Sequence, residues 1–170
     1  QKDQESLVTE RVSVILLLGW TLVPFFGWVD YVLYPELFGR FMIYRLIAAA
    51  MCAVLHSMNH RLKLGSKSFY LGIAAAYAVA LSIIAMILET GGYSTPYYAG
   101  LNLVFLGMCT VLTIRVSLLA IHSLAIYFLY LAAVSLFAKV DNVELFLANN
   151  MFVASTLGFT LVGSRVSHKL

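Results

Sequence analysis

Residues 116–137 read VSLLAIHSLAIYFLYLAAVSLF, and this stretch decides the fold class. It contains no Asp, Glu, Lys or Arg. An α-helix of about 20 apolar residues crosses a hydrocarbon core about 30 Å thick. The stretch is too long for a typical strand, and it lacks the alternating polarity of an outer-membrane barrel strand. It therefore predicts a transmembrane helix.

Five further stretches have the same apolar character. The six predicted spans cover residues 12–29, 41–58, 69–88, 97–114, 116–137 and 145–162. The segments between most of them carry turn formers, such as Pro35, Gly65 and the pair Gly91-Gly92. The sequence therefore predicts an all-α membrane protein, a bundle of six transmembrane helices that forms one domain over residues 1–170.

The composition excludes several classes of protein. Of the 170 residues, 62% are hydrophobic and 11% are charged, whereas a soluble domain has about 45–50% apolar and about 25% charged residues. A soluble enzyme is excluded, and the lipid bilayer is the expected environment. The net charge of +3 is spread along the chain without a basic run or motif, so we expect no nucleic-acid partner.

The positions of the Lys and Arg residues predict the orientation. Cytoplasmic loops of membrane proteins carry an excess of these residues. Eight of them gather on one side of the predicted bundle: Lys2, Arg11, Arg61, Lys63, Lys67, Arg115, Arg165 and Lys169. Only Arg40, Lys139 and the deeper Arg45 are assigned to the other side. Both termini are therefore predicted to lie in the cytoplasm.

Each predicted helix also places a polar group at a similar depth. An ionisable side chain at the centre of a membrane helix costs about 2.5–3.5 kcal/mol on insertion scales, so it needs a partner. At 1.5 Å per residue, these groups fall in one layer near the outer ends of the helices. The layer consists of Asp30, Arg45, Glu89, Asn102, Tyr130, Asn149 and Asn150.

Two interpretations of this layer are open. The groups could line a ligand pocket together with Tyr97 and Tyr98, because pockets combine an apolar lining with a few polar groups. They could instead bond to one another, with Arg45 paired with Asp30 or Glu89 and the amides joining neighbouring helices. Arg45 shares a predicted interior stripe with Phe41, Ala48, Cys52 and His56.

The histidines suggest a different function. His56 and His122 lie on different predicted helices and could be the axial ligands of haem b. They could instead bond to backbone or water near the membrane surface, and this interpretation is favoured because the sequence has no second stacked pair of histidines. His60 follows His56 at i+4, but we place it in the loop, so no metal site is predicted. No hydrolase or nucleotide-binding motif occurs, and we predict no catalytic residue.

Residues 89–106, ETGGYSTPYYAGLNLVFL, carry a resemblance to a known family. They resemble the TGG-x-S-x-PYYAGLNL signature of six-helix membrane sensor modules in bacterial receptor histidine kinases and class III adenylyl cyclases. The DYVLYPE at 30–36, the pair Asn149-Asn150 and the VGSRVSHKL at 162–170 fit the same pattern. The architecture is similar to the input domain of quorum-sensing receptor kinases of the cholera-autoinducer type.

The resemblance implies a sensor of the bacterial inner membrane. It implies that a small, largely apolar signal binds near the signature and that the last helix continues into a cytoplasmic cyclase or kinase, which these residues do not include. Such effectors are dimeric, so a homodimer is expected. Two alternatives remain: a dimerising anchor, since Gly72-Ala76-Ala80 and Ala154-Gly158 permit close helix approach, or a small transporter.

Overall fold

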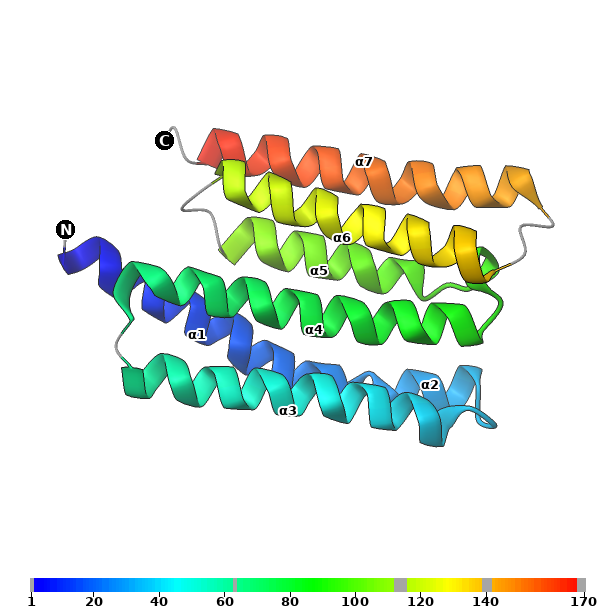
Figure 1. Ribbon diagram of the computed structural model, residues 1–170, viewed down its shortest axis with the longest axis horizontal. Coiled ribbons are helices and arrows are strands. Elements are labelled where there is room, and N and C mark those ends of the chain that lie inside the picture. The colour runs from blue at the N-terminus through cyan, green and yellow to red at the C-terminus, as the bar shows by residue number, and fades with distance from the viewer. Residues whose placement is uncertain (1, 63, 112–115, 139–141, 168–170) are drawn as a thin grey trace. The chain divides into compact units, whose positions relative to one another are not determined.

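The computed structural model describes residues 2–62, 64–111, 116–138 and 142–167. Within these ranges every regular element is a helix (Figure 1). The α-helices are α1 (Lys2–Phe25), α2 (Gly27–Leu33), α3 (Phe38–Leu62), α4 (Ser68–Glu89), α5 (Tyr98–Val111), α6 (Val116–Phe137) and α7 (Val143–Ser167). Two 3-10 turns, η1 (Gly65–Lys67) and η2 (Gly92–Ser94), precede α4 and α5. The predicted all-α class is confirmed.

Five helical segments are long and apolar enough to cross a membrane. They are Glu5–Leu33, Phe38–Leu62, Gly65–Glu89, Val116–Phe137 and Val143–Val166. The apolar part of α5, Tyr98–Thr110, is shorter. Residues 112–114 of the predicted fourth span lie outside the described residues. Five candidate spans thus agree with the predicted multi-span architecture, while the count of six stays a prediction.

The first predicted span is interrupted, which the sequence analysis did not anticipate. Instead of one helix over 12–29, the structure has α1, which already begins at Lys2, followed by α2 after a break at Phe26. Pro24 lies in the last turn of α1. Proline has no N–H and its ring clashes with the carbonyl four residues earlier, so it kinks or ends a helix. The segment Glu5–Leu33 as a whole is still long and apolar enough to form one candidate span, so the prediction of a span here agrees with the structure.

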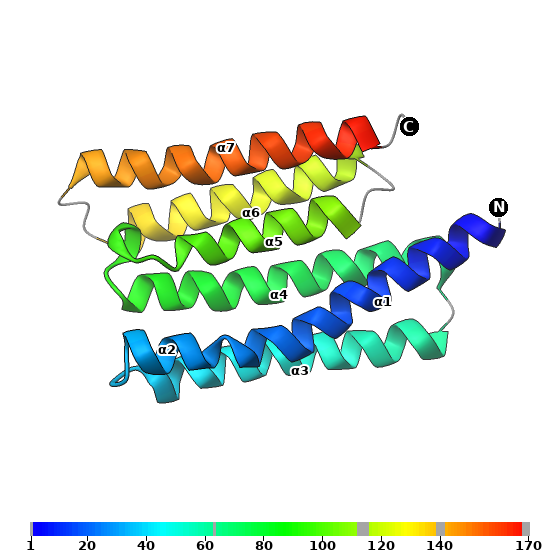
Figure 2. The same cartoon turned by 180° about the vertical axis from the view of Figure 1, so that it is seen from behind.

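The chain forms two compact units. Unit 1 covers Gln1–Ser82 and unit 2 covers Ile83–Leu170. The main contact in unit 1 joins α1 to α3, which run antiparallel (Figures 1 and 2). The fully buried α1 residues Val12 and Leu16 are four apart, as expected for one face of a helix. Gly19 lets α3 come close, because a β-carbon there would lie 2.7 Å from Sγ of Cys52.

Unit 2 contains the end of α4 together with α5, α6 and α7, and these last three helices alternate in direction (Figure 1). The side chains of its core include Leu101 and Phe105 on α5, Ile126 on α6, and Val153 on α7. The turn η2 lies against the end of α6 and the start of α7. Gly92 has φ +65°, and a β-carbon there would collide with Ala138, so this position requires glycine.

Candidate functional site

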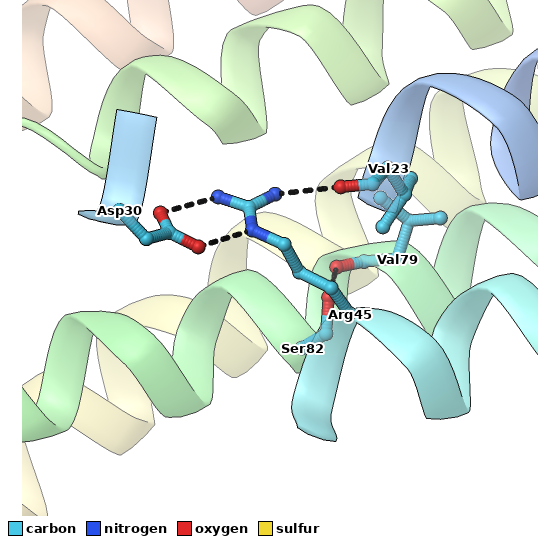
Figure 3. A network of polar contacts seen from close by, with 5 residues as sticks. All are labelled: Val23, Asp30, Arg45, Val79 and Ser82. Atoms are coloured by element: carbon cyan, nitrogen blue, oxygen red, sulfur yellow. Dashed lines mark hydrogen bonds and ion pairs between the residues drawn. The ribbon is translucent and has the colours of Figure 1, made fainter. Parts of the chain in front are cut away.

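Asp30 and Arg45 form a buried ion pair in unit 1 (Figure 3). Arg45 donates from Nε to Oδ2 of Asp30 at 2.5 Å and from Nη2 to Oδ1 at 2.8 Å. Asp30 is 0% exposed and Arg45 is 6% exposed. Two parallel N–H···O bonds match the planar guanidinium to the carboxylate, which is the strongest geometry for such a pair. Of the two acidic partners that the sequence suggested for Arg45, the structure thus shows Asp30 bound to it.

The helix break supplies a third acceptor for Arg45. Nη1 of Arg45 donates to the backbone carbonyl of Val23 at 3.3 Å (Figure 3). Val23 lies in the last turn of α1, where carbonyls have no N–H donor of their own helix. The helix break at Phe26 follows Val23, and the Arg45 guanidinium satisfies the Val23 carbonyl. Ser82, also drawn in Figure 3, donates its hydroxyl to Val79 of its own helix at 2.8 Å.

A second set of polar contacts ties η2 to α7 in unit 2. Asn149 donates from Nδ2 to the backbone carbonyl of Tyr93 at 2.6 Å. The backbone N–H of Asn142 donates to the Tyr93 hydroxyl at 2.6 Å, and the Tyr93 ring meets Phe146 edge-on at 5.9 Å. Asn142 also caps α7 by accepting the N–H of Leu145 at 2.9 Å. Asn149 therefore has a structural partner.

Tyr93 and Val23 were not among the predicted site residues. The Val23 contact runs through its backbone, so its side chain gave no signal. Tyr93 lies inside the ETGGYSTPYYAGLNLVFL segment, and this position was the available clue.

The remaining predicted residues of unit 2 behave differently. Among the described residues, both side-chain amide atoms of Asn102 on α5 are buried without a hydrogen-bond partner, and so is the Tyr130 hydroxyl on α6. Asn150 on α7 donates from Nδ2 to the carbonyl of Phe146 of its own helix at 2.7 Å, but its Oδ1 is buried and has no partner within the described part of the chain. The buried Ser123 hydroxyl, on the same stripe of α6 as Tyr130, is a further such group that the sequence analysis missed.

These unpartnered atoms matter because buried polar groups are nearly always hydrogen-bonded. Leaving one unsatisfied costs about 1–3 kcal/mol. Asn102, Tyr130 and Asn150 belong to three different helices of one compact unit. Tyr98, at the start of α5, lies edge-on to Phe152 of α7 at 6.1 Å, while Tyr97 is buried just before α5. Unit 2 thus holds polar groups that a bound molecule could satisfy.

The histidines within the described residues lie on two helices. His56 is on α3 and His122 is on α6, and both are half-buried. The prediction that His60 lies in a loop was wrong, because α3 continues to Leu62 and includes it. The rings of His56 and His60 meet edge-on with 4.6 Å between centroids. In the described part of the chain, no group of three or more His, Cys, Asp or Glu side chains could hold a metal ion.

The fold and its apolar helices define a multi-pass membrane protein of helical type. Residues 28–169 match the family model MASE8. The chain therefore belongs to the MASE8 family, a family of membrane-associated sensor domains. Searches of the curated proteins and of the solved structures gave no significant match.

Proposed function

We propose that this chain is the input module of a membrane receptor, which binds a small, largely apolar signal in unit 2 and regulates a C-terminal effector. Membership of a family of membrane-associated sensor domains supports a role in sensing. The observation that carries the binding site is the set of buried polar atoms without partners on Asn102, Tyr130 and Asn150. A signal that hydrogen-bonds to these atoms would recover the free energy that they cost in the empty protein.

The position of Asn150 gives the signal a route to the effector. Asn150 lies on α7, the last helix, and α5 and α7 are packed against each other. A ligand shifts a conformational equilibrium only if it binds one state better than the other. A signal bound to both Asn102 and Asn150 would favour the packing of α5 and α7 that brings these side chains together. The effector would detect the resulting shift of α7.

The setting that we propose follows from the charge distribution and the resemblance. The excess of Lys and Arg on one side favours cytoplasmic termini. The likeness of residues 89–106 to receptor signatures favours a bacterial inner membrane, a homodimer, and a nucleotide cyclase or histidine kinase as the effector. Arg45 does not belong to the proposed ligand site, because its guanidinium is bound to Asp30 and to Val23.

The test compares signalling with stability in the same variants. Asn102→Leu and Tyr130→Phe each remove polar atoms that have no partner in the structure. In the receptor with its effector, both variants should lose the response to a lipophilic extract of spent culture medium. Their stability should be unchanged or higher, because no hydrogen bond is lost. Tyr127→Phe, on a half-buried neighbour of Tyr130, is the matched control and should respond normally.

Two results would contradict the proposal. A normal response in both variants would show that these groups do not bind the signal. A loss of stability of about 1 kcal/mol or more in each variant would show that the atoms are hydrogen-bonded within the protein.

A further inference from the structure

A second polar cluster lies in unit 1, away from the ion pair along α3. It is built on His56 and His60, which are one turn apart and share a face of the helix. Their ring planes are inclined by 79°, and the centroids are 4.6 Å apart. Two imidazoles in this arrangement can turn nitrogen atoms toward a common point beside the helix. The spacing is that of the two histidines in helical zinc-binding motifs.

The hydrogen bonds around the rings leave lone pairs available. Nδ1 of His56 is buried and has no partner among the described residues. Nε2 of His60 lies 3.1 Å from the hydroxyl of Ser13 on α1. In the tautomer in which His60 donates its Nε2–H to Ser13, the lone pair is on Nδ1. A metal-ligating histidine usually donates its other N–H to such an acceptor, which fixes the tautomer and the orientation of the ring.

Asn59, which lies between His56 and His60 in the sequence, provides a side-chain amide oxygen as a further possible metal ligand. Its side chain is fully buried, and Nδ2 donates to the carbonyl of Thr9 on α1 at 3.0 Å. This bond fixes the amide, and it leaves Oδ1 buried without a partner in the described part of the chain. Asn59 and His60 therefore both bond to α1. The cluster thus offers two imidazole nitrogens and one amide oxygen near the packed surface of α1 and α3.

We propose that His56 and His60 bind a divalent transition-metal ion such as Zn²⁺ or Cu²⁺, with Oδ1 of Asn59 and water completing the coordination. Imidazole favours zinc, copper and nickel, whereas magnesium and calcium prefer carboxylate, carbonyl and water oxygens. The ring nitrogens need to reach about 2.0–2.1 Å from the ion, which requires rotation of the two side chains. With only two nitrogen ligands, the site binds more weakly than a closed structural zinc site.

The test measures Zn²⁺ binding to the detergent-solubilised chain, purified without a histidine tag, by isothermal titration calorimetry. His56→Ala and His60→Ala should each weaken binding by at least about tenfold. Ser13→Ala should weaken it by about 10–100-fold if its contact fixes the His60 ring. His122→Ala is the matched control because it removes a half-buried histidine from another helix, and it should leave the affinity unchanged. Mg²⁺ should give no comparable heat.

Electron paramagnetic resonance of Cu²⁺ bound to the unmodified chain provides a measurement that does not depend on the folding of any variant. The unmodified chain should show hyperfine coupling to two imidazole nitrogens, and each single His variant should show one. Coupling to fewer than two nitrogens in the unmodified chain would overturn the proposal. The proposal would also be overturned if the His56 and His60 variants bound Zn²⁺ with the same affinity as the unmodified chain or as His122→Ala.

Discussion

The ion pair between Asp30 and Arg45 allows a quantitative prediction about stability. We consider Arg45→Met, which keeps an unbranched apolar stem and removes the charged guanidinium, and Asp30→Leu, which replaces the carboxylate by an apolar group of similar size. Arg45→Met removes two bonds to the carboxylate and one to the Val23 carbonyl. Asp30 then remains as a fully buried charge without its guanidinium partner.

The magnitude follows from the burial of both groups. Breaking a buried ion pair by removing one partner costs about 3–5 kcal/mol, because an uncompensated charge is left behind. Each single variant should therefore lose about 3–5 kcal/mol of the free energy of unfolding. The double variant leaves no buried charge, and replacing a whole buried pair by apolar groups is often neutral or stabilising. It should be more stable than either single variant.

The assay is reversible unfolding by SDS in mixed micelles, followed by tryptophan fluorescence. Trp20 and Trp28 both lie in unit 1, which contains the ion pair, so they report on the affected unit. Arg61→Met, at an exposed arginine of α3, is the control and should change stability by less than about 0.5 kcal/mol. The reasoning is refuted if the single variants lose less than about 1 kcal/mol, or if the loss in the double variant equals the sum of the single losses.

Two further predictions concern packing and the η2 contacts. Gly19→Ala should lower stability by about 1–3 kcal/mol, because its methyl group would lie 2.7 Å from Sγ of Cys52. Gly39→Ala is the control, because no described atom lies within 4 Å of the new methyl group, and it should not lower the stability in the same SDS titration. Equal losses of stability at the two positions would contradict the close approach of α1 and α3 at Gly19. Tyr93→Phe should lower the free energy of unfolding by about 0.5–1.5 kcal/mol, because it removes the hydroxyl that accepts the hydrogen bond from the Asn142 N–H. An unchanged unfolding midpoint would show that this bond adds no stability.

The length of the continuous apolar stretches was enough to predict most of the helices. Residues 116–137 coincide with α6, and residues 69–88 differ from α4 by one residue at each end. The predicted interior stripe of α3 is also correct for Phe41, Ala48 and Cys52, which are fully or almost fully buried. These features depend on local composition and helical periodicity, which a single sequence contains.

The ends of helices were harder to predict because they depend on capping and packing. His60 belongs to α3 although the residues around it are polar, since Asn59 and His60 bond to Thr9 and Ser13 of α1. Those contacts join residues about 50 positions apart in the chain. Hydropathy ends the span at residue 58, where the apolar run stops, whereas tertiary contacts with α1 extend the helix.

The predicted polar layer separates into groups that are satisfied within the protein and groups that are not. Asn149 and Asn150 are neighbours of the same residue type, so composition cannot distinguish them. They point about 100° apart around α7. Asn149 therefore reaches the Tyr93 carbonyl, whereas Asn150 bonds to its own helix and leaves Oδ1 without a partner. Substitution of Asn149 should thus weaken the attachment of η2 to α7, whereas loss of Oδ1 at position 150 removes no hydrogen bond.

The same distinction separates the roles of the charged and the neutral members of the layer. Asp30 and Arg45 satisfy each other, so a ligand that bound either group would first have to replace two charge-assisted hydrogen bonds. Asn102 and Tyr130 offer buried polar atoms that have no hydrogen bond to any residue that the structure describes. Binding at these neutral groups therefore gains hydrogen bonds without an equivalent loss. For this reason the unpaired amide and phenol groups are better candidates for signal recognition than the arginine, although the arginine is the more conspicuous residue in the sequence.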